Sequence, residues 1–224
     1  MRTSDAKTSG EVHFPHPSGE LVIEIGLVML QGSRQAHVKA IESAAEKAGV
    51  QVNIREVRTP RDLMEPKLHA MILPGGESTT MRKVGGKAGT GVLGEIFKML
   101  RQWPDLPVLA TCAGTILLAD PQDEGPPIIQ AAVDRNAWGR QIDSFLASVS
   151  ILGEVEQTQC AFIRAPRFTE VPPGLTIASI EGETVGVRER NVIALTFHPE
   201  LSRTTVFHEM LLEAVAANND QVNA

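Results

Sequence analysis

The stretch Pro107-Val-Leu-Ala-Thr-Cys112-Ala-Gly114-Thr-Ile-Leu-Leu-Ala119 leads a short apolar run into a cysteine and then directly into a helical apolar pattern. Small residues surround the cysteine, with Ala110 two positions before it and Ala113 and Gly114 after it. Such neighbours permit the tight strand-to-helix turn, or nucleophile elbow, that exposes a nucleophile at the C-terminal edge of a sheet. A helix N-terminus also favours the thiolate. Taken alone, the stretch is equally consistent with a small buried cysteine.

The segments on either side of this stretch alternate between strand and helix patterns. Apolar, β-rich runs predict strands at 21–30, 50–57, 68–73 and 106–111, and apolar residues at helical spacing predict helices at 34–48 and 92–103. Gly49 follows the first of these helices as a suitable C-cap. Strands and helices in alternation favour a parallel sheet with helices on both faces.

The second half of the chain has a different rhythm. Short β-rich segments separated by Gly and Pro lie at 128–135, 144–152, 159–164, 175–180, 184–188 and 191–197. Helical periodicity returns only at 204–217. We therefore predict an α/β fold whose mostly parallel central sheet carries an antiparallel edge, which makes the sheet mixed.

Composition restricts the classes of function. The chain has 224 residues, 42% hydrophobic and 21% charged, with a formal net charge of −6. Without a long run of Lys or Arg, nonspecific nucleic-acid binding is disfavoured. No stretch approaches the roughly 20 apolar residues that span a bilayer, and no signal-peptide pattern is present at the N-terminus. We expect a cytoplasmic protein that binds neither nucleic acid nor membrane.

The ends of the chain differ from its middle. Residues 1–20 are polar and broken by Pro and Gly, so we predict a disordered extension there, one domain over 21–218 and a flexible tail over 219–224. His13 and His16 could ligate a metal, but nothing nearby completes a site. No metal or cofactor is expected.

A candidate base lies near the C-terminus, in Val192-Ile-Ala-Leu-Thr-Phe-His198-Pro199-Glu200. Residues i and i+2 of extended backbone point to the same side, so the imidazole of His198 and the carboxylate of Glu200 can meet. Pro199 favours extended backbone at the residue before it. A nucleophilic Cys112 needs such a base, and Glu200 would orient the ring and stabilise the imidazolium.

The other histidines and the second cysteine lack such a context. His37 and His208 lie in predicted helices and His69 lies at the start of a predicted strand, where a packed or solvated side chain is the simpler interpretation. Cys160 lies inside an apolar run without a turn, which favours a core position.

The segment Leu73-Pro-Gly75-Gly76-Glu77-Ser78-Thr79 follows the third predicted strand. Adjacent glycines allow a ligand to approach the backbone closely. The N–H groups of Gly76 and Ala113 could form an oxyanion hole, in which each donor is worth roughly 3–4 kcal/mol of transition-state stabilisation. The alternative is a turn that caps a helix through Ser78 or Thr79. A phosphate loop is less favoured because no Lys-Ser/Thr pair follows at the required spacing.

With these segments the chain resembles the class I glutamine amidotransferases, and among them the glutaminase subunit of pyridoxal 5′-phosphate synthase. The resemblance covers about residues 23–215. The segments that carry it are Leu30-Gln-Gly32, Leu73-Pro-Gly-Gly-Glu-Ser-Thr-Thr80, Thr111-Cys-Ala-Gly114, Arg135-Asn-Ala-Trp-Gly-Arg-Gln-Ile-Asp-Ser-Phe145, Phe162-Ile-Arg-Ala-Pro166 and Phe197-His-Pro-Glu-Leu201. Those that begin at Arg135 and Phe162 are specific to this subunit.

The resemblance implies a three-layer, flavodoxin-like fold and a catalytic triad of Cys112, His198 and Glu200. It also implies that glutamine is recognised by Gly76, Glu77, Ser78, Arg135, Ile163 and Arg164. Arginines and a glutamate are suitable complements to the α-carboxylate and α-ammonium of glutamine. Without the family, Arg135 and Arg164 would be interpreted as solvated surface charges.

The implied activity is hydrolysis of L-glutamine to glutamate and ammonia. The ammonia would pass to a separate (β/α)₈ synthase subunit that makes pyridoxal 5′-phosphate, in a large hetero-oligomer in which the docked synthase orders the oxyanion loop. The alternatives are a glutaminase that serves another synthase and a catalytically weak regulatory relative. Two features depart from the family pattern: Ala110 replaces a glycine, and the connection at 120–127 is shorter than expected.

Overall fold

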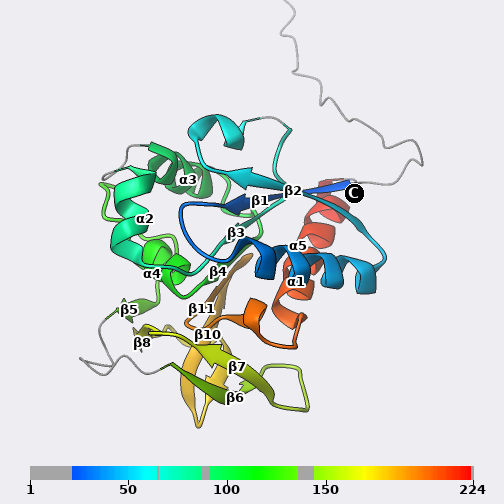
Figure 1. The fold of residues 1–224 in the computed structure, drawn as a ribbon, viewed down its shortest axis with the longest axis vertical. Coiled ribbons are helices and arrows are strands. Elements are labelled where there is room, and N and C mark those ends of the chain that lie inside the picture. Colours follow the sequence, from blue (N-terminus) through cyan, green and yellow to red (C-terminus); the bar gives the residue numbers. More distant parts are fainter. Residues whose placement is uncertain (1–21, 65, 87–90, 136–143, 223–224) are drawn as a thin grey trace, which may run out of the picture.

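A single large sheet organises the molecule (Figure 1). The computed structural model describes residues 22–64, 66–86, 91–135 and 144–222, without the side chains of 220–222. Within these ranges nine strands form one sheet in the order β2-β1-β3-β4-β11-β10-β9-β6-β7, and β5 pairs separately with β8. The predicted extension over 1–20 lies outside the described residues.

The first half of this sheet is parallel. Its strands are β1 (Val22–Val28), β2 (Gln51–Val57), β3 (Ala70–Leu73), β4 (Val108–Thr111) and β11 (Val192–Leu195). Each neighbouring pair among them runs parallel. Every residue of β3, β4 and β11 is buried. Their uninterrupted apolar sequences follow, because a parallel sheet is covered on both faces.

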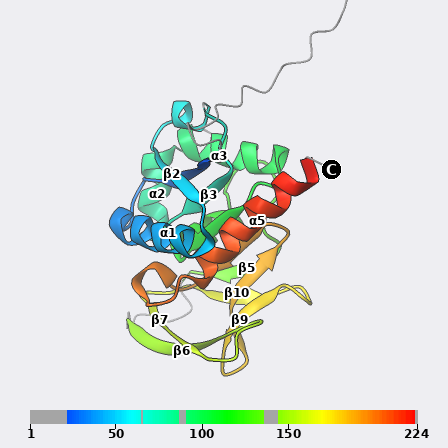
Figure 2. The ribbon, with the colours of Figure 1, turned by 90° about the vertical axis from the view of Figure 1, so that its right-hand side faces the viewer.

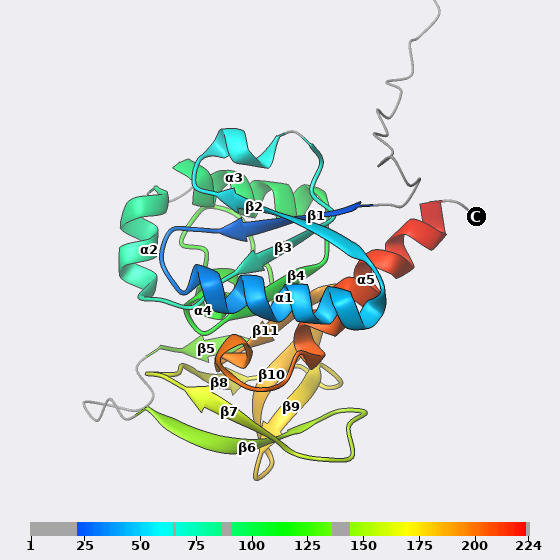
Figure 3. The ribbon, with the colours of Figure 1, turned by 45° about the vertical axis from the view of Figure 1, so that its right-hand side comes forward.

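Two layers of helices provide that cover (Figures 2 and 3). The helices α1 (Arg34–Ala48) and α5 (Val206–Val222) lie on one face, and α2 (Ser78–Gly85), α3 (Gly91–Gln102) and α4 (Ala113–Ala119) lie on the other. Alternate strand residues divide between the two cores, as a side-chain period of two requires. In β4, Leu109 packs into the core with α1 and α5, whereas Val108 and Ala110 pack into the other.

The second half of the sheet is antiparallel. It continues from β11 through β10 (Glu183–Glu189), β9 (Thr176–Ile180), β6 (Phe145–Ile151) and β7 (Thr158–Phe162). The separate pair consists of β5 (Ala132–Asp134) and β8 (Arg167–Glu170). This half occupies the lower part of Figure 1. The predicted mixed sheet with three layers is confirmed.

Element boundaries agree with the sequence predictions where the apolar pattern is strong. The helix at 34–48 has the predicted bounds and ends at Gly49, whose φ of 66° is the left-handed C-cap conformation. Three short elements were not predicted, namely β8 and the 3₁₀ turns η1 (Pro60–Leu63) and η2 (Pro199–Leu201), because they are too short to show a period.

The C-terminal helix is longer than predicted. It continues to Val222, so residues 219–222 are helical rather than part of a tail. The flexibility of the 219–224 segment stays a prediction. Within the described ranges, no helix is both long enough and apolar enough to cross a bilayer.

Candidate active site

Cys112 lies at the junction of β4 and α4, in the predicted elbow. Its backbone has φ 48° and ψ −106°, a region that costs a non-glycine residue on the order of 1–3 kcal/mol. The turn is held because the Cys112 N–H donates to the carbonyl of Leu195 at 2.8 Å. Gly114 allows the helix to approach β3, since an added Cβ would lie 2.3 Å from the Leu73 oxygen. The Cys112 thiol donates to the Ile163 carbonyl at 3.8 Å.

His198 and Glu200 form the contact that the sequence predicted. Nδ1 of His198 lies 2.7 Å from Oε1 of Glu200, and both residues are buried. The route differs from the extended backbone that was expected. β11 ends at Leu195, and Glu200 belongs to a 3₁₀ turn, η2 (Pro199–Leu201), with proline at its first position. Proline suits that position because its fixed φ fits a helical start.

The charges of this pair depend on their neighbours. Burial alone would lower the pKa of His198, but hydrogen bonds with Cys112 and Glu200 outweigh it and raise the pKa to about 10. Burial alone would raise the pKa of Glu200, but the hydrogen bond with His198 and the close approach of the His37 imidazole hold it well below its usual value. An imidazolium beside the Cys112 thiol and an ionised carboxylate are therefore favoured.

Gly75 makes room for the imidazole beside the cysteine. A Cβ added at Gly75 would lie 2.3 Å from Cε1 of His198 and 3.2 Å from Cβ of Cys112. The sequence predicts a role for Gly76 but not this one for Gly75. The available signal was a glycine pair directly after a buried strand, which indicates close approach but not of which partner.

Glu77 lies in the candidate oxyanion segment, residues 73–79, and caps the helix α2 that begins within it. Its carboxylate accepts the N–H groups of Thr79 at 3.0 Å and Thr80 at 2.7 Å, and the Thr80 hydroxyl at 2.8 Å. The Thr80 hydroxyl, together with these N–H groups, lowers the pKa of Glu77 to about 2. The alternative of a helix cap is therefore correct for this segment, but the capping residue is Glu77 instead of Ser78 or Thr79.

Gln31 supports the oxyanion segment from the loop after β1. Its Oε1 accepts the N–H of Glu77 at 2.6 Å. Gly76 adopts a φ of 153°, and an added Cβ there would lie 2.9 Å from the same oxygen. Gly32, with φ 107°, allows the loop to contact the Gly75 carbonyl. The backbone that carries the Gly76 N–H is thus fixed by a side chain from another loop.

Comparison with known proteins places this chain in a family. A family model described as the SNO glutamine amidotransferase family matches residues 27–217. The chain belongs to this family. The pyridoxal 5′-phosphate synthase subunit PdxT of Pyrococcus furiosus is 36% identical over 202 residues, which cover 87% of this chain and 100% of the relative. A subunit of the same name from Methanothrix thermoacetophila is 39% identical over 195 residues, which cover 85% and 98%.

Solved structures agree with this assignment. A crystal structure described as a glutamine amidotransferase is 33% identical, with a TM-score of 0.66, and the match covers 86% of this chain and 98% of that one. A glutamine amidotransferase from Thermotoga maritima has a TM-score of 0.54 over 90% of this chain and 85% of its own. At 16% identity it supports the fold alone. The fold is the flavodoxin-like fold of class I glutamine amidotransferases.

Of the residues expected to recognise glutamine, Glu77 and Ser78 belong to the candidate oxyanion segment and Arg135 lies beside it. Nη2 of Arg135 donates to the Thr79 hydroxyl at 2.9 Å and lies 3.7 Å from the Glu77 carboxylate. Ser78 is buried at the start of α2. Arg164 is exposed, with a φ of 45°. The rest of the specific motif that begins at Arg135, residues 136–143, lies outside the described residues.

The structure accommodates both departures from the family pattern. Ala110 is fully buried, and its methyl group packs in the core on the α2, α3 and α4 face. The short 120–127 connection is attached to two helices by arginines. Arg82 of α2 donates to the carbonyls of Asp120 and Pro121, and Arg101 of α3 forms two hydrogen bonds with Asp123.

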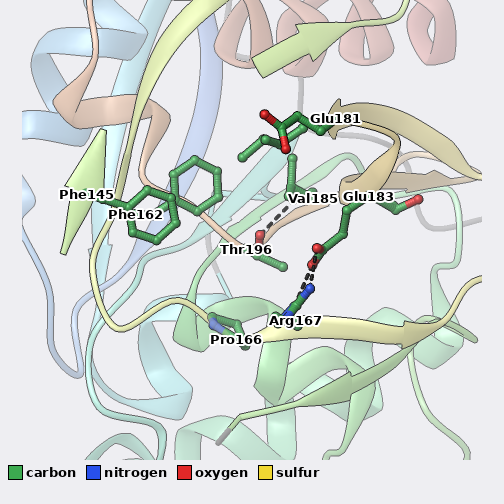
Figure 4. Close-up of a pocket in the computed structure, with 10 residues that line it drawn as sticks. Phe145, Phe162, Pro166, Arg167, Glu181, Glu183, Val185 and Thr196 are labelled. Atoms are coloured by element: carbon green, nitrogen blue, oxygen red, sulfur yellow. Dashed lines mark hydrogen bonds and ion pairs between the residues drawn. The ribbon is translucent and has the colours of Figure 1, made fainter. Parts of the chain in front are cut away.

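A separate cavity of about 270 Å³ lies in the antiparallel half (Figure 4). Its lining contains none of the predicted site residues and consists of Phe145, Phe162, Pro166, Arg167, Ile180, Glu181, Glu183, Thr184, Val185 and Thr196. Arg167 and Glu183 bind each other there, and Phe145 stacks on Phe162 at 5.0 Å between ring centroids. Two of its charged side chains, Arg167 and Glu183, thus pair with each other. Among the described residues, no group of three or more His, Cys, Asp or Glu side chains could hold a metal ion.

Both Cys160 and Cys112 are free thiols. Cys160 is fully buried, and burial raises its pKa to about 11. The core position predicted for it is confirmed. The thiol beside His198 is the one with the surroundings of a nucleophile.

Proposed function

We propose that this amidotransferase hydrolyses L-glutamine to L-glutamate and ammonia with Cys112, His198 and Glu200, and supplies the ammonia to a synthase subunit that makes pyridoxal 5′-phosphate. The observation that carries the proposal is the arrangement of Cys112, His198 and Glu200. A strained cysteine at a helix N-terminus lies beside a buried imidazole, and that imidazole is 2.7 Å from a buried carboxylate. Membership of a glutamine amidotransferase family supports glutamine as the substrate.

The reaction has two stages. The Cys112 thiolate attacks the side-chain amide carbon of glutamine, and the N–H groups of Gly76 and Ala113 stabilise the oxyanion. His198 donates a proton to the amide nitrogen, the C–N bond breaks and ammonia leaves. A water molecule then attacks the γ-glutamyl thioester while His198 accepts its proton, which releases glutamate and restores the thiolate. Glu200 stabilises the imidazolium throughout.

Recognition of glutamine requires charges of both signs. In this proposal Arg135 and Arg164 bind the α-carboxylate, Glu77 binds the α-ammonium, and Ser78 and Ile163 shape the pocket. Arg135 already lies beside Glu77 at 3.7 Å. A zwitterion that binds between them would exchange this partly exposed ion pair for two new ones, so the exchange costs little.

The partner is proposed from the names of the relatives, which are subunits of pyridoxal 5′-phosphate synthase. We propose a (β/α)₈ synthase subunit in a large hetero-oligomer, a cytoplasmic location, and one catalytic domain over 21–218 that makes no contact with nucleic acid or membrane. A different recipient synthase and a weak regulatory relative are the alternatives.

One assay separates these functions. Glutamate release by the purified chain is measured with and without the pyridoxal 5′-phosphate synthase subunit, and again with Cys112→Ala. We expect release that the synthase stimulates and that Cys112→Ala abolishes. Release without stimulation would indicate another recipient. Absence of release under both conditions would indicate a regulatory relative, and turnover by Cys112→Ala would exclude the mechanism.

A further inference from the structure

Two buried imidazoles lie behind the carboxylate of Glu200. His37 comes from α1 and His208 from α5, and neither has any exposed surface. Their ring centroids are 5.8 Å apart. Within the described part of the chain, no ring nitrogen of either residue has a hydrogen-bond partner of ordinary geometry. Buried polar groups are usually paired, so two such rings beside an active-site carboxylate require an explanation.

His37 is the ring that reaches the proposed triad. Its Nε2 lies 3.4 Å from Oε1 of Glu200, and the two side chains are 0% and 2% exposed. This separation exceeds the range of about 2.7–3.2 Å that is usual for an N–H···O hydrogen bond. At low local dielectric the contact is nevertheless a strong electrostatic one.

The same carboxylate oxygen is approached from two sides. Nδ1 of His198 lies 2.7 Å from Oε1 of Glu200, and Nε2 of His37 approaches the same atom. The other oxygen, Oε2, is buried and has no hydrogen-bond partner among the described residues. The last torsion of a glutamate is broad, so local geometry alone does not fix where Oε1 points. The contact with His37 can fix it.

We infer that His37 is a positioning residue for the proposed triad: its Nε2–H holds Oε1 of Glu200 in place for Nδ1 of His198. The inference rests on the proposed roles of Cys112, His198 and Glu200 and adds a fourth residue from a different helix. His37 does not touch the reacting atoms. It acts through Glu200, whose orientation determines that of the His198 ring.

His208 lies beside His37 and contributes no charge. The titratable groups around His37 are Glu200 on η2, His198 before it and His208 on α5. Burial, followed by the proximity of His37, lowers the pKa of His208 to about 3, so its ring is neutral in the folded protein at neutral pH. The neutral His208 ring packs against His37, so the Glu200 carboxylate is the charged partner of the His37 ring.

Two variants whose new side chains have equal length test the role of His37. His37→Gln keeps an N–H donor, and His37→Met has the same chain length without one. The first readout is the rate at which iodoacetamide alkylates Cys112 as a function of pH, corrected with Cys112→Ser for any reaction at Cys160. This rate reports the thiolate and does not require glutamine.

We expect His37→Met to move the alkylation profile to higher pH by about one unit, because the imidazolium loses a well-placed carboxylate. We also expect kcat for glutamine to fall about tenfold or more with KM unchanged, as for other small misplacements of a catalytic group. His37→Gln restores both values. His208→Met is the matched control in the same buried cluster and changes neither.

The contrary results are distinct. A folded His37→Met variant with the wild-type alkylation profile and kcat would overturn the inference, as would an equal shift in His208→Met, which would indicate a general packing effect. A wild-type chain that releases no glutamate but whose alkylation profile depends on His37 would refute the proposed function while the positioning role stands.

A measurement on the unaltered protein covers the case in which the variants fail to fold. Nitrogen-15 NMR of the histidine rings identifies which nitrogen of His37 carries a proton. The inference requires a proton on Nε2. A His37 ring protonated on Nδ1 alone has no proton to direct at Glu200 and would overturn the inference.

Discussion

The corner that holds Cys112, His198 and Glu200 differs from the segment that is expected to hold glutamine. The corner is buried, and its members contact one another in the orientation that the chemistry needs. Glu77 and Arg135, the charged residues expected to recognise glutamine there, are each 43% exposed at the side chain. Glu77 caps α2, and Arg135 donates to Thr79 on the same helix.

This difference separates the proposed reacting groups from the groups proposed to choose the substrate. The proposed reacting groups follow the ends of β4 and β11, and these strands pair side by side, so the positions of both strand ends are fixed. The recognition groups are attached to short polar segments, where binding can exchange one partner for another at small cost. Perturbations of the two regions should therefore change different measured quantities.

The largest effect is expected at Gly75, where the two regions meet. In Gly75→Ala the added methyl group would lie 2.3 Å from Cε1 of His198. The imidazole must move away from Cys112, and we expect kcat to fall about 100-fold. Steady-state kinetics and a thermal melt measure the effect on catalysis and on stability.

Gly186→Ala is the control for Gly75→Ala. Its Cβ would also be crowded, at 2.7 Å from Cδ2 of Leu195, but it lies in β10 and touches neither Cys112 nor His198. We expect it to lower stability and leave kcat unchanged. Wild-type kcat in Gly75→Ala would show that the corner is less rigid than the structure indicates.

A smaller effect is expected behind the corner, at His208. Its pKa is lowered from 6.5 to about 3 by burial and by His37, so below pH 6.5 the unfolded chain binds more protons than the folded chain. The folded state therefore loses stability as the pH falls from 6.5 toward 3. At pH 5 this loss is about 2 kcal/mol, from roughly 1.4 kcal/mol per pH unit.

His208→Met removes that titration. Urea unfolding at pH 7 and pH 5 should show a smaller loss of stability in the variant than in the wild type. Equal losses in both proteins would mean that His208 is not buried as a neutral ring.

The smallest effect is expected at Glu77, in the recognition segment. Its pKa is lowered from 4.5 to about 2, so the stability it contributes is present above pH 4.5 and is lost as the pH falls through 2. Glu77→Ala removes the cap of α2 and should cost about 1 kcal/mol or less at pH 7, since the carboxylate is partly exposed. Near pH 2 the difference in stability between Glu77→Ala and the wild type should be much smaller than at pH 7.

Glu95→Ala is the matched control for that measurement. Glu95 lies on α3 in an exposed pair with Lys98 at 3.7 Å and caps nothing. Its removal should cost less than that of Glu77 at pH 7. For glutamine turnover, we expect Glu77→Ala to raise KM more than it lowers kcat, and an effect confined to kcat would contradict the role in recognition.

The sequence predicted those parts of the molecule that depend on local pattern. The strands of the parallel half, the helix ending at Gly49 and the turn at Cys112 each follow from apolar spacing and small residues. The contact of His198 with Glu200 was predicted, but not the 3₁₀ turn that makes it, because a single turn has no period to detect.

The missed contributions come from residues that are distant in sequence. Gly75 is needed because of a ring that follows β11, and Gln31 reaches the N–H of Glu77 from the loop after β1. His37 gave a further signal. It lies on the buried face of α1 with Ala40, Ile41 and Ala44, and a titratable residue on an apolar stripe indicates either a packing or a functional role.

The central position of β11 has a consequence for how the enzyme matures. This strand is the last to leave the ribosome, yet it lies between β4 and β10. Until it is placed, the Cys112 N–H has no Leu195 carbonyl to receive it, and the thiol lacks its proposed base, His198. Such non-local pairing is slow compared with local contacts. Partly synthesised chains therefore carry an inactive thiol, and the appearance of glutaminase activity marks the end of folding.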